Sequence, residues 1–189
     1  VDFTQPAALE QIQAQKPAVV WLESPTNPLL KVIDLGAVCA ITQPLGIPVV
    51  VDNTFATALV QRPLDLGATL SLTSTTKYIN GHSDALGGAV CTNDPEWHQK
   101  MVFSQKALGL QPSPFDCWLI TRGIKTLPLR LKQQMANAAA LADQLAGHAK
   151  VNWVRYPHRS DHPQHQVASR QMRAGGAIVT VSFNASQEQ

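Results

Sequence analysis

The chain has 189 residues, of which 44% are hydrophobic and 15% charged, and its formal net charge is +2. This length suffices for one or two domains with a buried core, and the small, scattered positive charge argues against a nucleic-acid partner. No apolar run approaches the ~20 residues of a membrane-spanning helix, and no signal sequence is recognisable. We therefore expect a cytoplasmic protein with neither a nucleic-acid nor a membrane partner.

Four short apolar runs in the first half of the chain predict strands. They are residues 18–22, 48–51, 70–72 and 85–91, and a helix is expected at 35–44 between the first two. Runs that are apolar throughout, rather than alternating, are typical of strands buried on both faces. The strand–helix–strand order predicts an α/β fold with a mainly parallel sheet flanked by helices.

From residue 96 the pattern becomes helical. Apolar residues with a period near 3.6 predict a long helix that begins after an N-cap at Thr126 and stops at Gly147. Its length suggests a bridge between two domains. Beyond it, strands at 151–156 and 177–183 flank a helix at 164–172.

The three cysteines, Cys39, Cys91 and Cys117, are too far apart for a C-x-x-C pair. An odd number without such a pair indicates neither a disulfide framework nor a zinc site. We expect buried free thiols in a reducing compartment.

Polar residues follow three of the expected strands at the point where each strand ends. These clusters are Glu23-Ser24, Asp52-Asn53-Thr54 and Ser74-Thr75-Thr76-Lys77. Ligands of open parallel sheets bind at the carboxyl ends of the strands. We therefore expect the three clusters to meet at one edge of the sheet and to form a binding site.

Lys77, Ser74, Thr76 and Asp52 together suit pyridoxal 5'-phosphate (PLP). A lysine can be stored as a Schiff base with an aldehyde cofactor, and two hydroxyls on one side of an extended segment can donate to its phosphate. The hydroxyls of Ser74 and Thr76 can instead bond to their own turn. A desolvated carboxylate at Asp52 needs a cation, such as a protonated pyridine nitrogen. A magnesium site is the alternative for Asp52, but the chain has no G-x-x-x-x-G-K-S/T loop.

His158, His162 and His165 raise the possibility of a metal site, but their spacing fits no standard one. We expect them to lie in a solvated loop or at a substrate entrance, and no metal is predicted. For His82 we expect a structural role in the loop that follows Lys77.

Four motifs resemble the trans-sulfuration enzymes, the PLP-dependent family of cysteine and methionine metabolism. They are residues 23–28 (ESPTNP), 52–55 (DNTF), 74–84 (STTKYINGHSD) and 115–119 (FDCWL). The resemblance runs in order through the whole chain. It implies an aspartate-aminotransferase-like (type I) fold, with 1–125 as the central part of the large PLP-binding domain, 126–148 as a bridging helix and 149–189 as the start of a smaller domain.

The same resemblance implies roles for five residues. Lys77 would bind the cofactor covalently and shuttle protons, Asp52 would pair with its ring nitrogen, and Ser74 and Thr76 would hold its phosphate. Asn27 would lie near its ring hydroxyl. The family's ring-stacking tyrosine and its arginine for the substrate carboxylate find no match between Val1 and Gln189, so we expect this chain to be a segment of a longer protein.

The implied substrate is a small amino acid, and the implied assembly is a homotetramer. We expect gamma-replacement on an O-acylhomoserine by cysteine, as in cystathionine gamma-synthases. Cleavage of cystathionine, as in the gamma- and beta-lyases, is the alternative. A different class of function, a non-catalytic fragment that serves only as an interaction module, also stays open.

Overall fold

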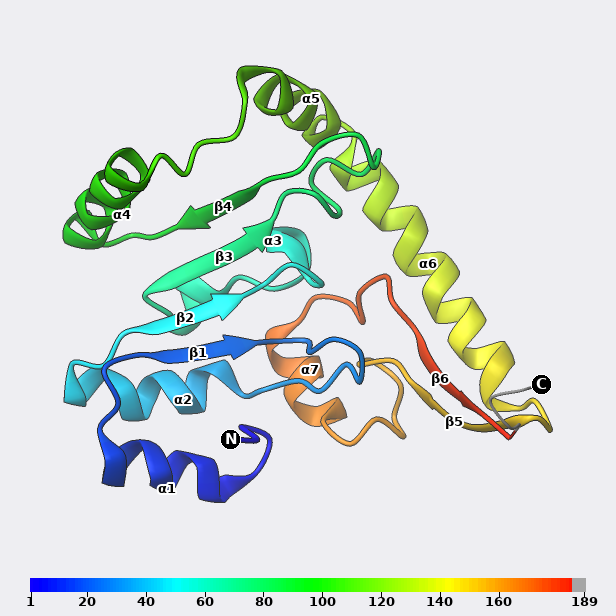
Figure 1. Cartoon of the computed structure of the whole chain (residues 1–189). Coiled ribbons are helices and arrows are strands. Elements are labelled where there is room, and N and C mark those ends of the chain that lie inside the picture. The colour runs from blue at the N-terminus through cyan, green and yellow to red at the C-terminus, as the bar shows by residue number, and fades with distance from the viewer. Residues whose placement is uncertain (185–189) are drawn as a thin grey trace.

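The computed structural model describes residues 1–184 (Figure 1). Its main sheet has the order β1-β2-β3-β4, with strands at Val20–Glu23, Val49–Asp52, Leu70–Ser74 and Gly88–Cys91. The first three strands are parallel and β4 runs antiparallel to β3, so the mainly parallel sheet is confirmed. A separate antiparallel pair is formed by β5 (Val151–Arg155) and β6 (Thr180–Phe183).

Seven α-helices accompany these strands in the described residues. They are α1 (Pro6–Gln15), α2 (Leu35–Thr42), α3 (Thr57–Val60), α4 (Pro95–Leu108), α5 (Pro114–Ile124), α6 (Leu127–Ala146) and α7 (His165–Gln171). The expected helices at 35–44, 127–147 and 164–172 correspond to α2, α6 and α7. Helices α1 and α3 correspond to no expected element.

The first core lies between β1 and β2 and the two helices α1 and α2. Leu22 and Val51 on the strands pack with Leu35 and Val38 of α2, and all four are at most 2% exposed. Helix α2 begins after Asp34, whose carboxylate accepts a hydrogen bond from the amide of Ala37 at 3.0 Å and so caps the helix.

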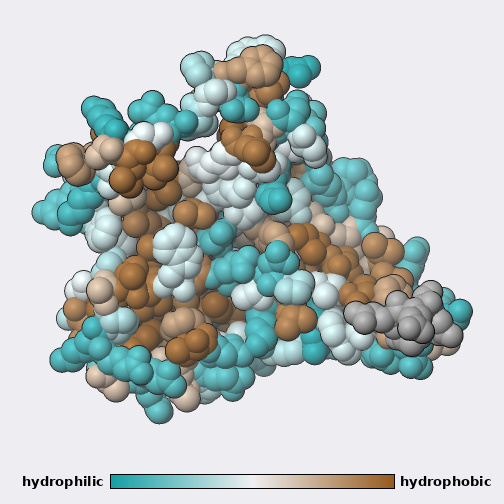
Figure 2. Space-filling view, in the orientation of Figure 1, coloured by the Kyte–Doolittle hydropathy of each residue, from teal (hydrophilic) through white to brown (hydrophobic). Residues whose placement is uncertain are grey.

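Burial on both faces of the strands is found for β2 only. Val49, Val50 and Val51 are all buried. In contrast, Trp21 of β1 is 60% exposed and Val90 of β4 is 44% exposed. Figure 2 shows apolar side chains gathered on the side of the molecule where the sheet and α4 lie in Figure 1. A purely apolar run therefore did not specify which strands have both faces covered.

Helix α6 contacts two further cores. Leu127 and Leu131 in its first two turns pack with elements that include α3 and α7. Ala138 and Ala142 pack with Val154 of β5 in another cluster. The helix thus extends from the neighbourhood of the main sheet to the β5–β6 pair (Figure 1). The division into 1–125, 126–148 and 149–189 stays a prediction, and residues 185–189 of its last part lie outside the described residues.

Thr126 is the N-cap residue of α6, as predicted, but its side chain does not cap the helix. Its backbone is helical, and its hydroxyl makes no capping bond. The hydroxyl instead donates to the carbonyl of Gly123 at 3.2 Å and accepts from Nε of Arg130 at 2.9 Å. The tight turn between α5 and α6 therefore uses this side chain to join two helices.

The expectation of buried thiols holds for one cysteine of three. Cys39 is buried in α2, where burial raises the pKa of its thiol to about 11, but Cys91 and Cys117 are exposed. Both exposed cysteines are free. Among residues 1–184, no helix combines the length and the apolar character needed to cross a membrane.

Candidate active site

The three polar clusters meet at one edge of the sheet, as expected from the parallel strands. Glu23 and Asp52 are paired in register, and the amide of Ser24 donates to the carbonyl of Asp52 at 3.3 Å. The amide of Asn53 donates to the carbonyl of Leu72 at 2.8 Å. The ends of β1, β2 and β3 are therefore joined beyond the last residue pairs of the sheet.

A buried amide network fixes the ends of the first two strands. Gln61 is 1% exposed, and its Nε2 donates both to the carbonyl of Ser24 at 2.8 Å and to Oδ1 of Asn53 at 2.9 Å. Nδ2 of Asn53 returns a bond to the carbonyl of Gln61 at 2.8 Å. Gln171 of α7 donates to Oε1 of Gln61 at 3.0 Å. Helix α7 is thereby tied to the strand ends.

Asp52 stands half-buried at the end of β2. Its Oδ1 accepts a bond from the amide of Thr54 at 2.9 Å. The hydroxyl of Thr54 in turn accepts from the amide of Ser74 at 2.8 Å, which links the ends of β2 and β3. Asp52 and Ser74 therefore lie at the ends of neighbouring strands, and both are hydrogen-bonded to Thr54.

Lys77 follows β3 in a turn. Its amide donates to the carbonyl of Ser74 at 3.3 Å, and its carbonyl accepts from the amide of Gly81 at 2.8 Å. Because β3 ends at Ser74, the prediction that Ser74 and Thr76 share one side of an extended segment is wrong. The hydroxyl of Thr76 bonds to the backbone of Gly87, donating to the carbonyl at 3.3 Å and accepting from the amide at 3.0 Å.

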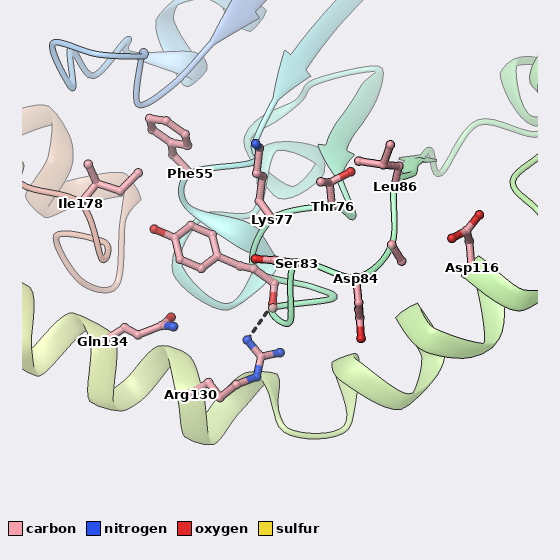
Figure 3. Close-up of a pocket in the computed structure, with 13 residues that line it drawn as sticks. Phe55, Thr76, Lys77, Ser83, Asp84, Leu86, Asp116, Arg130, Gln134 and Ile178 are labelled. Atoms are coloured by element: carbon pink, nitrogen blue, oxygen red, sulfur yellow. Dashed lines mark hydrogen bonds between the residues drawn. The ribbon is translucent and has the colours of Figure 1, made fainter.

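A cavity of about 880 Å³ opens beside this turn. Lys77 is exposed, and its side chain lies on the cavity wall, with the amine beside Phe55 and pointing away from α6 (Figure 3). Arg130 and Gln134 of α6 form the opposite side. This volume falls in the range of small-molecule sites, ~300–1,000 Å³. Lys77 thus lines a space that can hold a cofactor and a small substrate.

Asn27 lies apart from this cavity, on the exposed part of the loop that follows β1. The loop is held at three points. Ser24 Oγ accepts from the amide of Ile33 at 3.1 Å, Thr180 donates to the carbonyl of Pro28 at 2.5 Å, and Nε2 of His162 bonds the carbonyl of Leu30 at 3.1 Å. The structure does not bring Asn27 to the Lys77 cavity wall.

The expectation of a solvated loop is wrong for His162, which is 4% exposed. Its Nδ1 accepts from the amide of Gln164 at 3.1 Å, so Nε2 carries the hydrogen that it donates to Leu30. Burial lowers the pKa of His162, and the bond to Leu30 opposes that shift. Within residues 1–184, no three His, Cys, Asp or Glu side chains are grouped to hold a metal ion.

His82 contacts the loop after Lys77, in line with its expected structural role. Its Nδ1 lies 2.7 Å from the carbonyl of Asn80, a residue that is fully buried. Nδ2 of Asn80 donates to Oδ1 of Asp84 at 2.8 Å. The loop is thus bonded within itself from Asn80 to Asp84.

Two residues of the site were absent from the sequence-based prediction. Gln61 lies in a segment with no motif, and only tertiary contacts reveal its role. Arg130 lies beside the apolar stripe that contains Leu127 and Leu131, and an arginine adjoining a buried stripe is a signal that could have drawn attention to it.

Comparisons with known proteins agree on one family. A sequence model of the family described as Cys/Met metabolism PLP-dependent enzyme matches residues 1–189. A probable cystathionine gamma-synthase of Herpetosiphon aurantiacus is 44% identical over 188 residues, 100% of this chain and 59% of that protein. A cystathionine gamma-lyase of Dictyostelium discoideum is also 44% identical, over 100% of this chain and 49% of its own length.

Solved structures show the same relation. The crystal structure of cystathionine gamma synthase from Xanthomonas oryzae pv. oryzae in complex with cystathionine matches with a TM-score of 0.96 and 47% identity, over 98% of this chain and 48% of that one. The chain therefore spans about half the length of that structure. The type I PLP-dependent fold expected from the motifs is confirmed.

The matching family is PLP-dependent, and the residues present fit this cofactor. The Lys77 amine faces an open cavity, and Asp52 offers a half-buried carboxylate whose Oδ1 alone is bonded among the described residues. The Ser74 hydroxyl has no hydrogen-bond partner in residues 1–184. A primary amine, an acid and a hydroxyl donor match the aldehyde, ring nitrogen and phosphate of PLP.

Proposed function

Because this chain belongs to the PLP-dependent enzymes of cysteine and methionine metabolism, we propose that the protein acts on a sulfur amino acid with Lys77 as its cofactor-binding and catalytic residue. The observation that carries this proposal is the position of Lys77, at the carboxyl edge of a parallel sheet and on the wall of an 880 Å³ cavity. When bound, PLP supplies an electron sink that weakens the bonds at the substrate's α-carbon.

The chain's own residues would hold the cofactor and move protons. The Lys77 amine would bind it and then exchange a proton with the substrate's carbon atoms. The Asp52 carboxylate would accept a hydrogen bond from the ring nitrogen and keep it protonated, because an ion pair in a desolvated site favours both charges.

Three further residues would fix the orientation of the cofactor. Ser74 would donate its hydroxyl hydrogen to the phosphate. Thr76 would do the same after exchanging its 3.3 Å bond to the Gly87 carbonyl. Asn27 would serve the ring hydroxyl only if its exposed loop lies against the bound cofactor in the assembled protein.

The reaction that we propose is gamma-replacement on an O-acylhomoserine, in which the thiolate of cysteine forms a C–S bond at the γ-carbon and the acyloxy group leaves as a carboxylate. The structure of the Xanthomonas cystathionine gamma synthase in complex with cystathionine supports it. Cleavage of cystathionine is the second candidate, favoured by the gamma-lyase relative, whose 44% identity equals that of the Herpetosiphon gamma-synthase. We further propose that the protein is a cytoplasmic homotetramer.

Covalent labelling tests the role of Lys77. The native protein that carries this sequence is mixed with PLP, reduced with borohydride and digested, and the labelled peptide is identified by mass. We expect the label on Lys77 and its loss in Lys77→Ala, whereas Lys106→Ala, on exposed α4, keeps it. A label on another lysine, or none in the unaltered protein, would contradict the proposal.

A product assay separates the two reactions. The native protein is supplied with an O-acylhomoserine and cysteine, or with cystathionine alone. Formation of cystathionine from the first mixture supports the synthase. Release of a 2-oxo acid and ammonia from the second, without the first activity, supports a lyase instead.

A further inference from the structure

Arg130 joins the turn after Lys77 to the junction of α5 and α6. Its Nη1 donates to the carbonyl of Tyr78 at 2.9 Å (Figure 3). Its Nη2 donates to the carbonyl of Ile79 at 3.3 Å. Nη2 also donates to the carbonyl of Gly123 at 2.9 Å, and Nε donates to the hydroxyl of Thr126 at 2.9 Å. One planar side chain therefore bonds two residues of the turn and two of the helix junction.

The guanidinium is used here without a carboxylate partner. Among residues 1–184, no Asp or Glu oxygen lies within ion-pair distance of Arg130. Its bonds go to three carbonyls and one hydroxyl. The rigid fork of five N–H groups can serve several carbonyls at once, while a lysine ammonium is a single point with flexible reach. The geometry therefore calls for arginine itself and not for any cation.

Two glycines make room for this contact. A methyl group at Gly81 would overlap the guanidinium of Arg130, and Gly81 also has a positive φ of 71°. A methyl group at Gly123 would overlap the carbonyl oxygen of Asn80. The backbone of the turn therefore lies in direct contact with the backbone of the helix junction. The guanidinium of Arg130 lies beside this contact and bonds both segments.

We propose that Arg130 is a positioning residue for Lys77, an inference that rests on the proposed function of that lysine. Tyr78 and Ile79 directly follow Lys77, and the carbonyl of Lys77 is itself bonded to Gly81. Because Arg130 holds the carbonyls of Tyr78 and Ile79, the backbone at Lys77 is restricted in position. The Lys77 amine therefore samples fewer positions at the cavity wall. Misplacement by about 1 Å can cost about 100-fold in rate.

Variants in the native, PLP-loaded protein test this role. Arg130→Gln removes the fork and the charge, and Arg130→Lys keeps the charge alone. Lys132→Gln, an exposed cation on the same helix, is the matched control. We expect kcat to fall about 10- to 100-fold in Arg130→Gln with KM changed less than about 3-fold, a partial recovery in Arg130→Lys, and no change in the control.

Hydrogen exchange gives a readout that does not depend on activity. We expect the amides of residues 78–84 to exchange at least about 10-fold faster in Arg130→Gln, while those of 138–146 keep their rates. Gly81→Ala places a methyl group where the guanidinium of Arg130 lies. In the folded variant we expect the same faster exchange of the amides of residues 78–84.

Three results for Arg130→Gln would each overturn the inference. They are unchanged exchange in 78–84, faster exchange throughout the protein, and faster local exchange with an unchanged kcat. An Arg130→Lys variant equal to the unaltered protein would also do so, because charge alone would then suffice. Failure of the proposed function is recognised separately, by a borohydride label that is not on Lys77.

Discussion

The loop that carries Lys77 and the loop that carries Asn27 are both anchored by side chains from much later in the chain, but through different chemistry. Arg130 of α6 holds the first with a guanidinium that donates to backbone carbonyls. His162 holds the second with a neutral imidazole that bonds the Leu30 carbonyl. A guanidinium with several donors thus anchors the loop of the proposed catalytic residue, and an imidazole whose pKa is lowered by burial anchors the other.

Burial differs between the two loops as well. The amide network of Gln61 lies under the start of the Asn27 loop and is closed to water, while Lys77 faces an open cavity. An anchor that is buried costs more to lose, because its former partners stay unsatisfied. The comparison teaches that the Asn27 side depends on internal polar bonding, and the Lys77 side on close backbone approach.

The largest effect is expected from breaking the Asn27 side at Gln61. Gln61→Leu removes the side-chain partner of the Ser24 carbonyl and of the Asn53 amide oxygen, and it leaves the Gln171 amide with only its bond to the carbonyl of Ile33. We expect the free energy of unfolding to fall by about 2–4 kcal/mol, measured by urea denaturation.

The control for this prediction is Gln133→Leu. Gln133 is exposed on α6 and bonds only Asn137 among the described residues. Its replacement should change the free energy of unfolding by no more than about 0.5 kcal/mol. Equal losses in the two variants would contradict a special role for the buried network.

A somewhat smaller effect is expected from breaking the Lys77 side at Gly123. In Gly123→Ala the added methyl meets the backbone of Asn80, and overpacking costs about 1–3 kcal/mol. Gly147→Ala is the matched control, because nothing lies within 4 Å of a methyl group there. Thermal unfolding should show a lower Tm for Gly123→Ala and an unchanged Tm for Gly147→Ala. A Gly123→Ala protein as stable as the control would show that the junction is looser than described.

The smallest effect is expected from a change of pH, which tests the His162 anchor of the Asn27 loop. Burial lowers the pKa of His162 in the folded protein, so the unfolded chain binds a proton more readily below its ordinary pKa of about 6.5. Stability therefore falls as pH decreases from that value toward the lowered folded pKa, by at most about 1.4 kcal/mol per pH unit for this group.

The variant that checks this slope is His162→Gln. Below a pH of about 6.5, the free energy of unfolding of this variant should depend less on pH than that of the unaltered protein. Burial also lowers the pKa of His158, so some slope remains. An identical slope in both proteins would show that His162 is not the titrating anchor.

The sequence predicted the strand ends well because each ends at a polar cluster, and parallel pairing then brings Asp52 and Ser74 to one edge. It predicted α6 from its apolar period. It failed where local pattern competes with tertiary contact: Thr126 bonds across a helix junction, and His162 is buried by a distant loop. The roles of Gln61 and Arg130 depend on partners that lie far away in sequence.

The length of α6 has a mechanical consequence. Twenty residues at about 1.5 Å each make a rod of about 30 Å, with Arg130 in its first turn and Ala142 against the β5–β6 pair near its other end. A tilt of about 5° at the far end would move the guanidinium by roughly 2 Å. We therefore expect a change in the packing of β5 against the far end of α6 to alter the contact between Arg130 and the turn that follows Lys77.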